Sequence, residues 1–185
     1  ALEDIAITRV LPNLTVVVPC DAIETRKATI AFAEMMGPCY LRFTREKSPI
    51  ITTEATPFVI GKSYIVREGK HVTIAACGPL LYEALLAADI LSKRHKIEAE
   101  VINCHTLKPF DTKTLLTSVQ KTKACVTVEE HQLIGGLFGV VSETLARTLP
   151  TPIEPVGMQD TFGESGGSDS VSFRRVGHRI CDASF

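Results

Sequence analysis

The chain has 185 residues, 45% of them hydrophobic, which is enough for one packed domain or two small ones and excludes a largely disordered chain. Twenty basic residues balance 21 acidic ones, so the formal net charge of −1 gives no chain-wide field that would attract nucleic acid or an anionic membrane. No apolar run reaches the roughly 20 residues of a membrane-spanning helix, and we expect a cytoplasmic protein that binds a small metabolite or another protein.

Four elements are predicted near the start of the chain. They are an amphipathic helix over 2–11, an apolar strand over 14–19, a helix over 21–36 and a strand over 39–43. Asp21 can cap the second helix, and Glu24, at the third helical position, can close a capping box. Gly37 and Pro38 then end this helix.

These four elements bury too little apolar surface to offset the entropy of ordering them, so they do not form a core of their own. Residues 1–45 are therefore predicted to be the latter part of an α/β domain whose missing half comes from elsewhere. Ala1 is not a methionine and the first helix begins without a lead-in, which favours a chain cut from something longer.

Residues 46–57 contain two prolines and little periodicity, as expected of a linker to a second domain over 58–185. In that domain we predict strands over 58–66, 72–77, 99–104, 124–128 and 152–156, and helices over 78–95, 111–120 and 137–148. Strands that are apolar on both faces and alternate with helices are typical of a parallel sheet. The pattern predicts a three-layer α/β domain with helices on both sides of the sheet.

The six cysteines never form a C-x-x-C pair, and five of them lie in or beside apolar runs. They are Cys20, Cys39, Cys77, Cys104, Cys125 and Cys181. We expect reduced core thiols in a cytosolic protein, because a disulfide framework suits a smaller secreted chain.

Ligands of an open α/β sheet gather at the carboxyl ends of its strands, where four loops of this chain should lie along one edge. They are Gly78-Pro79, His105-Thr106, Glu129-Glu130-His131 and Gly157-Met158-Gln159-Asp160. Their histidine and carboxylate side chains could bind a metal or act as general acid and base, but the local spacings match no known ligand pattern. Polar groups that cap helix ends and meet a partner are the favoured interpretation.

A nucleophile is not indicated either. Residues 163–167, GESGG, have the letters of a G-x-S-x-G elbow. Such an elbow joins a strand to a helix, whereas this loop precedes a polar tail. The chain alone is predicted to have no catalytic residues and no metal site.

Arg42 and Arg45 follow the second strand and form the better functional pair. Residues three apart near a strand exit point to different sides, so the two should not act as one clamp. One can pair structurally while the other faces an anion, because a guanidinium donates a planar fork that suits a phosphate. A solvated or ion-paired arginine is the alternative for either residue.

Five ordered blocks of sequence resemble the C-terminal section of a transketolase, especially the kind encoded as two separate halves. They are ALEDIAITRVLPNLTVVVPCDAIETRKA, GPCYLRFTRE, VINCHTLKPFD, TVEEHQLIGGLFGVVSE and GMQDTFGESG. The resemblance covers residues 1 to about 167. HTLKPFD and DTFGESG favour a transketolase over the related deoxyxylulose-phosphate synthase or 2-oxo acid dehydrogenase beta subunit.

The resemblance implies a full enzyme of the pentose phosphate pathway type, which transfers a two-carbon ketol unit between sugar phosphates with thiamine diphosphate and Mg2+. It makes residues 1–45 part of a pyrimidine-binding domain and 58–185 the transketolase C-terminal domain. The activating glutamate and the diphosphate and metal ligands belong to parts not matched here. The chain is therefore expected to have no cofactor-binding residue, and neither thiamine diphosphate nor Mg2+ should bind it alone.

By position, the resemblance makes Arg45 the residue that binds the phosphate of the sugar substrate. It implies two partners, an N-terminal transketolase half or subunit and the mate of a homodimer. Glu130 and His131 fall in the domain that supports dimer assembly, so we expect them to make hydrogen bonds within or between subunits. The tail after Gly167 departs from the family pattern and is assigned no role. A non-catalytic α/β interaction module is the alternative from another class.

Overall fold

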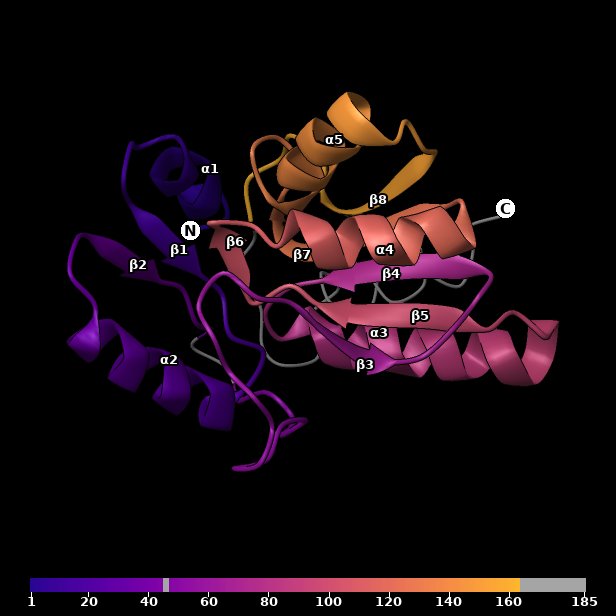
Figure 1. Cartoon of the computed structure of the whole chain (residues 1–185), viewed down its shortest axis with the longest axis horizontal. Helices are drawn as coiled ribbons and strands as arrows, with labels where there is room; N and C mark the ends of the chain where they lie inside the picture. Colours follow the sequence, from indigo (N-terminus) through magenta and orange to yellow (C-terminus); the bar gives the residue numbers. More distant parts are fainter. Residues whose placement is uncertain (45–46, 164–185) are drawn as a thin grey trace.

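The computed structural model describes residues 1–44 and 47–163 (Figure 1). Its elements are α1 (Asp4–Arg9), β1 (Thr15–Val17), α2 (Ala22–Glu34), β2 (Cys39–Leu41), β3 (Tyr64–Arg67), β4 (Val72–Ala76), α3 (Leu80–Ile90), the π-helical turn η1 (Leu91–His95), β5 (Ala99–Asn103), β6 (Thr106–Lys108), α4 (Thr112–Thr122), β7 (Cys125–Gln132), α5 (Leu137–Thr148) and β8 (Ile153–Met158). Arg45, most of the GESGG loop and the tail lie outside the described residues.

The central sheet has five strands in the order β3-β5-β4-β7-β8. Its last four strands are mutually parallel, and every residue of β4 and β5 is buried. The predicted parallel sheet is thereby confirmed, because strands buried on both faces need helices over each side. The first strand differs, since β3 runs antiparallel to β5. The short connection between β3 and β4 reverses the chain direction.

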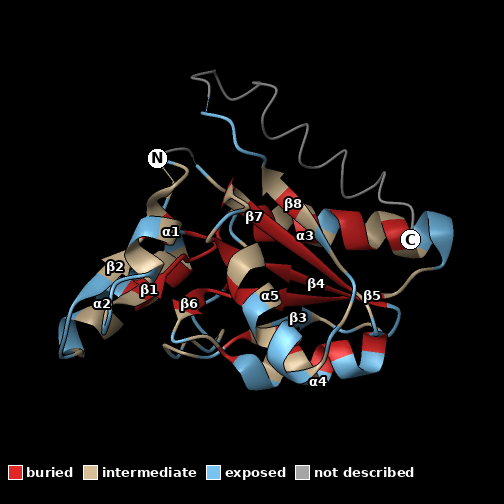
Figure 2. Ribbon diagram, turned by 90° about the horizontal axis from the view of Figure 1, so that it is seen from above, coloured by how far each residue is buried: buried red, intermediate tan, exposed pale blue. Residues whose placement is uncertain are grey.

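Helices cover both faces of this sheet, which confirms the three-layer prediction (Figure 2). On one face, α3 packs Leu80, Leu81 and Ala84 against apolar side chains of β4 and β7. On the other face, α4 and α5 contribute Leu115 and Leu137 to a second apolar cluster. Within the described ranges, no helix is both long and apolar enough to cross a membrane.

The first segment of the chain, residues 1–44, lies at one end of this sheet (Figure 1). Its strand β1 pairs in parallel with β2 and antiparallel with β6, which was predicted as a loop. Ile5, Val16 and Val18 belong to the same buried cluster as Leu115 and Leu137. The first segment, which cannot form a core by itself, thus gains both a strand and a core from the rest of the chain.

Asp21 caps α2 as predicted and also holds the segment expected to be a linker. Its carboxylate accepts the N–H of Glu24 at 2.9 Å and the N–H groups of Ile51 and Thr52 at 2.7 and 2.6 Å. The Glu24 carboxylate accepts the Cys20 N–H instead of closing a capping box on Asp21. Residues 51 and 52 are therefore fixed to the first segment.

The cysteines within the described ranges are all free thiols, as expected. Those buried in the core are Cys20, Cys77, Cys104 and Cys125, whereas Cys39 is exposed and differs from the prediction. Burial raises the pKa of the Cys104 thiol to about 12, so this group is unreactive at neutral pH. Cys181 lies outside the described residues.

Candidate functional site

The carboxyl ends of the central parallel strands are occupied by the first segment (Figure 1). Val18 donates its N–H to the carbonyl of His105 at 2.7 Å and accepts the N–H of Gly78 at 3.2 Å. The loop over 157–160 is held at the same end, because the Asp160 N–H donates to the Gln132 side chain at 3.0 Å. The edge at which an open α/β sheet normally binds ligands is therefore covered here by the chain itself.

Glu129, Glu130 and His131 form the end of β7, which we call the β7 corner. Glu129 caps the N-terminus of α5, since its two carboxylate oxygens accept the N–H groups of Leu137 at 2.6 Å and Phe138 at 2.8 Å. Burial raises the pKa of Glu129 to about 8, although these N–H donors act in the opposite direction. A Cβ on Gly136 would overlap the carboxylate, so the turn needs glycine at this position.

His131 caps α1 in the first segment. Its Nε2 accepts the Ile5 N–H at 3.1 Å, with Ala6 N–H at 3.4 Å, and its Nδ1 lies 2.7 Å from the Gln132 carbonyl. A carbonyl can only accept, so Nδ1 carries the proton and Nε2 is the bare acceptor. The imidazole is therefore neutral, and its 3.8 Å approach to the Glu129 carboxylate is no ion pair.

This geometry predicts that acid loosens the docking of α1. Desolvation lowers the pKa of His131, and a proton on Nε2 would face two N–H donors. The neutral His131 imidazole therefore contributes folding stability that is fully present above its unfolded pKa of about 6.5. This contribution is lost as the pH falls through the lower pKa that His131 has in the folded chain. We expect urea unfolding to show a steeper loss of stability below pH 6.5 for the natural chain than for His131→Gln. His95→Gln, at an exposed site, should keep the natural pH dependence; equal slopes for all three would contradict the assignment.

Arg42 joins the first segment to the end of β7. Its guanidinium lies 3.1 Å from the Asp4 carboxylate and 3.6 Å from that of Glu130, and it donates to the Glu130 carbonyl at 2.9 Å. Tyr40 donates its hydroxyl to Asp4 at 2.8 Å. The side chain of Arg42 is only 10% exposed, so this is a partly buried network and Arg42 is the structural member of the predicted pair.

Glu130 and His131 thus both bind the first segment of their own chain. Burial raises the pKa of Glu130, with the Arg42 charge opposing that shift. His131 has no exposed surface. A contact of either residue with another subunit stays a prediction.

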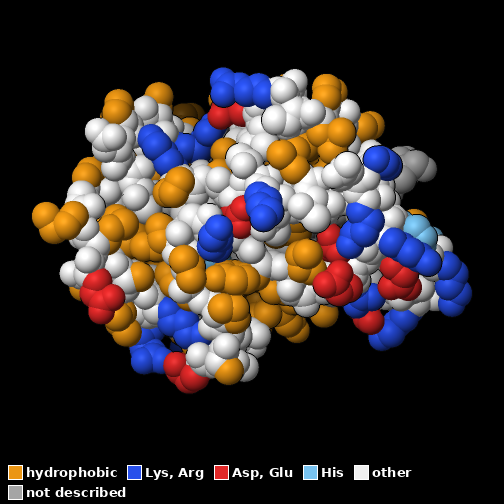
Figure 3. Space-filling model, in the orientation of Figure 1, with side chains coloured by type: hydrophobic (Ala, Val, Ile, Leu, Met, Phe, Trp, Pro, Cys, Tyr) orange, Lys and Arg blue, Asp and Glu red, His pale blue; other side chains and the backbone are white. Residues whose placement is uncertain are grey.

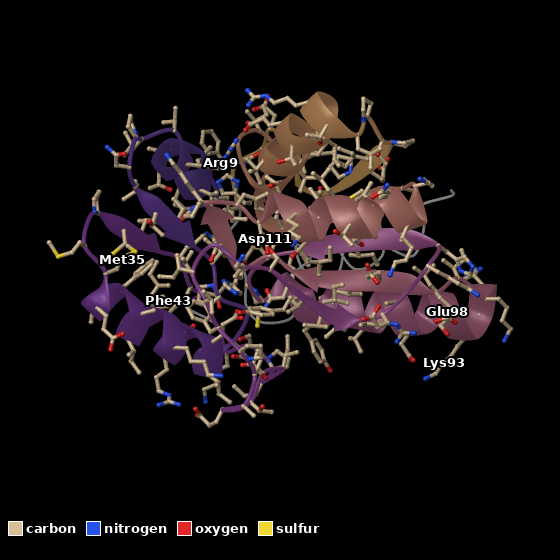
Figure 4. All side chains as sticks on the ribbon, in the orientation of Figure 1. Arg9, Met35, Phe43, Lys93, Glu98 and Asp111 are labelled. Atoms are coloured by element: carbon tan, nitrogen blue, oxygen red, sulfur yellow. The ribbon has the colours of Figure 1, made fainter. Side chains whose placement is uncertain are left out.

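Arg9 makes a further connection that the sequence pattern did not indicate. It extends from α1 toward α5 (Figure 4), where it pairs with Glu143 at 2.6 Å and donates to the Gly135 carbonyl at 2.9 Å. Asn103 of β5 similarly donates to Glu24 of α2 at 2.8 Å. These partners lie far apart in the chain, and no local spacing connects them.

His105 is a core residue. Its ring stacks on Phe58 with centroids 4.4 Å apart, and its Nδ1 lies 2.9 Å from the Thr106 hydroxyl. Burial lowers the pKa of His105 to about 4, so the ring is neutral at physiological pH. It packs the sheet end and has no surface through which to meet a substrate.

The polar groups of the β7 corner are therefore engaged in holding the first segment and in capping α5. All four polar side-chain atoms of Glu129 and His131 have partners within the chain, and neither residue is exposed. Across residues 1–44 and 47–163, no three His, Cys, Asp or Glu side chains form a group that could hold a metal ion.

The parallel pair β1 and β2 has a second carboxyl edge, next to the start of α2. Asp21 and Glu24 lie there and are engaged by backbone N–H groups. Arg45, the predicted phosphate ligand, follows this edge in sequence but lies outside the described residues.

Fold and site together define a class of protein: a three-layer α/β domain onto whose strand ends part of a second α/β domain is docked. The family described as "Transketolase, C-terminal domain" matches residues 61–173, and "Transketolase, pyrimidine binding domain" matches residues 1–50. The chain belongs to the transketolase family.

Individual relatives agree with this assignment. The 6-deoxy-6-sulfo-D-fructose transketolase subunit of a Clostridium species is 42% identical over 91% of this chain and 52% of its own length. A subunit of the apulose-4-phosphate transketolase of Phocaeicola vulgatus is 33% identical over 92% of this chain and 54% of its own. The chain thus spans about half the length of these relatives. A solved structure titled "Split gene transketolase, inactive beta4 tetramer" superposes with a TM-score of 0.91 at 38% identity, covering 99% of this chain and 60% of that one.

Proposed function

We propose that this chain is the C-terminal part of a split transketolase and is inactive by itself. The full enzyme transfers a two-carbon ketol unit between sugar phosphates, and this chain supplies assembly contacts and one substrate contact. The observation that carries the proposal is the order of the two family matches, pyrimidine-binding then C-terminal, over nearly the whole chain. Its proposed partners are an N-terminal transketolase subunit and a second copy of itself, in the cytoplasm.

The carboxylates buried at the strand ends are not free to hold a diphosphate through Mg2+. A diphosphate held through Mg2+ needs carboxylate or carbonyl ligands around the ion. The carboxylates of Asp21, Glu24 and Glu129 instead accept backbone N–H groups of this chain. We therefore propose that cofactor and metal are held by other parts of the full enzyme, so no chemical step is assigned to residues of this chain.

Arg45 is the proposed contact to the sugar substrate. A guanidinium donates two parallel N–H groups to a tetrahedral oxyanion. A sugar phosphate offers such an anion, and so does the sulfonate in the substrate named for the Clostridium relative. The terminal anion is thus proposed to fix the substrate, while the rest of the enzyme decides which sugar reacts.

The test is ketol transfer by a longer chain that restores the upstream half-domain, mixed with its N-terminal partner. We expect turnover with thiamine diphosphate and Mg2+, and about a tenfold or greater rise in the Michaelis constant of the phosphorylated or sulfonated sugar for Arg45→Ala. Arg26→Ala is the matched control, because Arg26 is an exposed arginine of the first segment that already pairs with Glu54.

Each negative outcome has its own meaning. An unchanged Michaelis constant in Arg45→Ala would make Arg45 a surface arginine and leave the family function intact. A complex that assembles without ketol transfer would favour the non-catalytic interaction module. Acceptance of a 2-oxo acid in place of a ketose donor would favour the sister enzymes, deoxyxylulose-phosphate synthase or a 2-oxo acid dehydrogenase beta subunit.

A further inference from the structure

We propose that Asp21 is a positioning residue for the sugar substrate, because it fixes the stretch of chain that follows Arg45. This stretch, residues 47–52, is called the return segment, since it ends at Asp21 beside the carboxyl edge of β1 and β2. The inference rests on the proposed function, in which Arg45 binds the substrate anion, and goes beyond it by naming the residue that holds the chain in place.

The Asp21 carboxylate divides its two oxygens between α2 and the return segment. Oδ1 accepts the Glu24 N–H at 2.9 Å and the Thr52 hydroxyl at 2.8 Å. Oδ2 accepts two backbone N–H groups, those of Ile51 at 2.7 Å and Thr52 at 2.6 Å. Asp21 and Thr52 are only 3% and 5% exposed, so water hardly competes for these bonds. The backbone of the return segment is therefore held by one buried side chain.

The Asp21 carboxylate is ionised in this setting. Burial acts to raise its pKa, but the backbone N–H groups of Glu24 and Thr52 and the other donors outweigh burial, and the pKa is lowered. Hydrogen bonds to an ionised acceptor are stronger than those to a neutral amide. An asparagine at this position would therefore hold the return segment less firmly.

The chain is fixed on both sides of Arg45 in the sequence. Before it, Arg42 donates its backbone N–H to the Val17 carbonyl at 2.9 Å, at the end of β1. After it, Ile51 is held by Asp21 and also packs its side chain against the apolar cluster that contains Leu80 of α3. One anchor is a strand partner and the other is a buried carboxylate together with apolar packing.

Helix α2 also holds the residues just beyond the return segment. Lys27 donates to the carbonyls of Thr53 and Thr56 at 2.7 and 2.5 Å, and the neighbouring Arg26 pairs with Glu54. Basic side chains gather at this end of α2 in the space-filling view (Figure 3). The end of the return segment therefore cannot shift without breaking contacts on both sides of it.

These anchors reduce the entropy that would be lost when the substrate anion is bound. A cation on an unanchored segment has to be ordered at the moment of binding, and that ordering weakens affinity. A segment anchored at Arg42 and at Ile51 has already lost this freedom on folding. Releasing the return segment should therefore weaken binding of the anion and leave the chemical step unchanged.

Asp111 provides a matched control, because it uses its carboxylate in the same way elsewhere. It caps α4 by accepting the Thr114 N–H at 3.2 Å, and it accepts the Ser63 N–H at 3.0 Å from a distant segment. These partners lie outside the return segment. Asp111→Asn therefore reports what the loss of such a carboxylate does to the fold in general.

The test measures ketol transfer by the longer chain with its N-terminal partner, with one anionic sugar and one sugar that has no phosphate or sulfonate. Asp21→Asn keeps a side-chain oxygen that can cap α2, but its amide nitrogen cannot accept the N–H groups of Ile51 and Thr52. We expect the Michaelis constant of the anionic sugar to rise about fivefold. Both kcat and the Michaelis constant of the uncharged sugar should stay within about twofold. Asp111→Asn should leave the ratio of the two Michaelis constants unchanged.

Two further variants make the test decisive. In the double variant with Arg45→Ala, Asp21→Asn should add nothing to the rise caused by Arg45→Ala, because the contact that it positions is gone. Circular dichroism checks the fold of each variant. Should Asp21→Asn fail to fold, Thr52→Val removes only the hydroxyl donor and should give a smaller rise of about twofold, again for the anionic sugar alone.

The outcomes separate this inference from the proposed function. If Arg45→Ala raises the Michaelis constant of the anionic sugar and Asp21→Asn does not, Asp21 only stabilises the fold. Equal rises for both sugars, or full additivity in the double variant, also overturn the positioning role and leave the Arg45 contact intact. An unchanged Michaelis constant in Arg45→Ala, or a complex without ketol transfer, refutes the proposed contact or function itself, and the positioning role fails with it.

Discussion

Replacing Arg42 with alanine should destabilise the chain by about 3 kcal/mol, because the change leaves two partly buried carboxylates without their cation. Asp4 and Glu130, whose side chains are 12% and 24% exposed, would lose the guanidinium that both of them contact. The loss should appear first as release of α1 from the β7 corner. Urea unfolding gives the free energy, and amide hydrogen exchange over 2–9 reports the local release.

Two variants bracket the Arg42 result. Arg42→Lys keeps the charge but not the planar fork, so its loss should be intermediate. Arg26→Ala removes a pair in which both side chains are more than half exposed, and should change stability by no more than about 0.5 kcal/mol. If Arg42→Ala were as mild as Arg26→Ala, the docking of the first segment would have to depend on apolar packing alone.

Replacing Gly136 with alanine should cost about 3 kcal/mol, the sum of overpacking and a lost helix cap. The added Cβ would overlap the Glu129 carboxylate and lie 2.7 Å from Nδ1 of His131. The carboxylate must then leave the N-terminus of α5, and the histidine that caps α1 must shift with it. Thermal and urea unfolding measure the effect on the whole chain.

Gly139→Ala is the matched control, three residues further along. There the nearest atom to a Cβ is the flexible end of Arg9 at 3.2 Å, and alanine favours a helix over glycine. We expect a neutral or slightly stabilising change. The double variant Glu129→Ala with Gly136→Ala should lose less than the sum of its parts, since the overlapping carboxylate is gone. Strict additivity would mean that some other contact makes Gly136 necessary.

Local patterns predicted most of the elements because their causes are local. The alternation of apolar strands and helices predicted β4, β5, β7 and β8 and the helices between them, and Asp21 caps α2 as expected. The strand β6 escaped prediction. Its three residues have no strand pattern of their own and are ordered only by pairing with β1, about ninety residues away.

The candidate site shows the same division. From the residues of the β7 corner, the sequence by itself determined that carboxylates and an imidazole would stand at a strand end, and that capping was the favoured role over catalysis. The sequence pattern did not identify the partners of these groups. His131 accepts from Ile5, Glu130 pairs with Arg42, and Glu129 caps the N-terminus of α5, and each of these contacts depends on how the segments pack.

The sequence by itself determined the fold class and the family, because the alternation of apolar strands and helices and the order of the sequence motifs can both be recognised in local stretches of the chain. Only the tertiary structure decided that the strand ends are covered by the first segment, that the histidine of the β7 corner is a neutral acceptor, and that the corner binds its own chain. The physical reason is that a hydrogen bond fixes the protonation state and role of a polar group through its partner, and the donor to His131 lies 126 residues away along the chain.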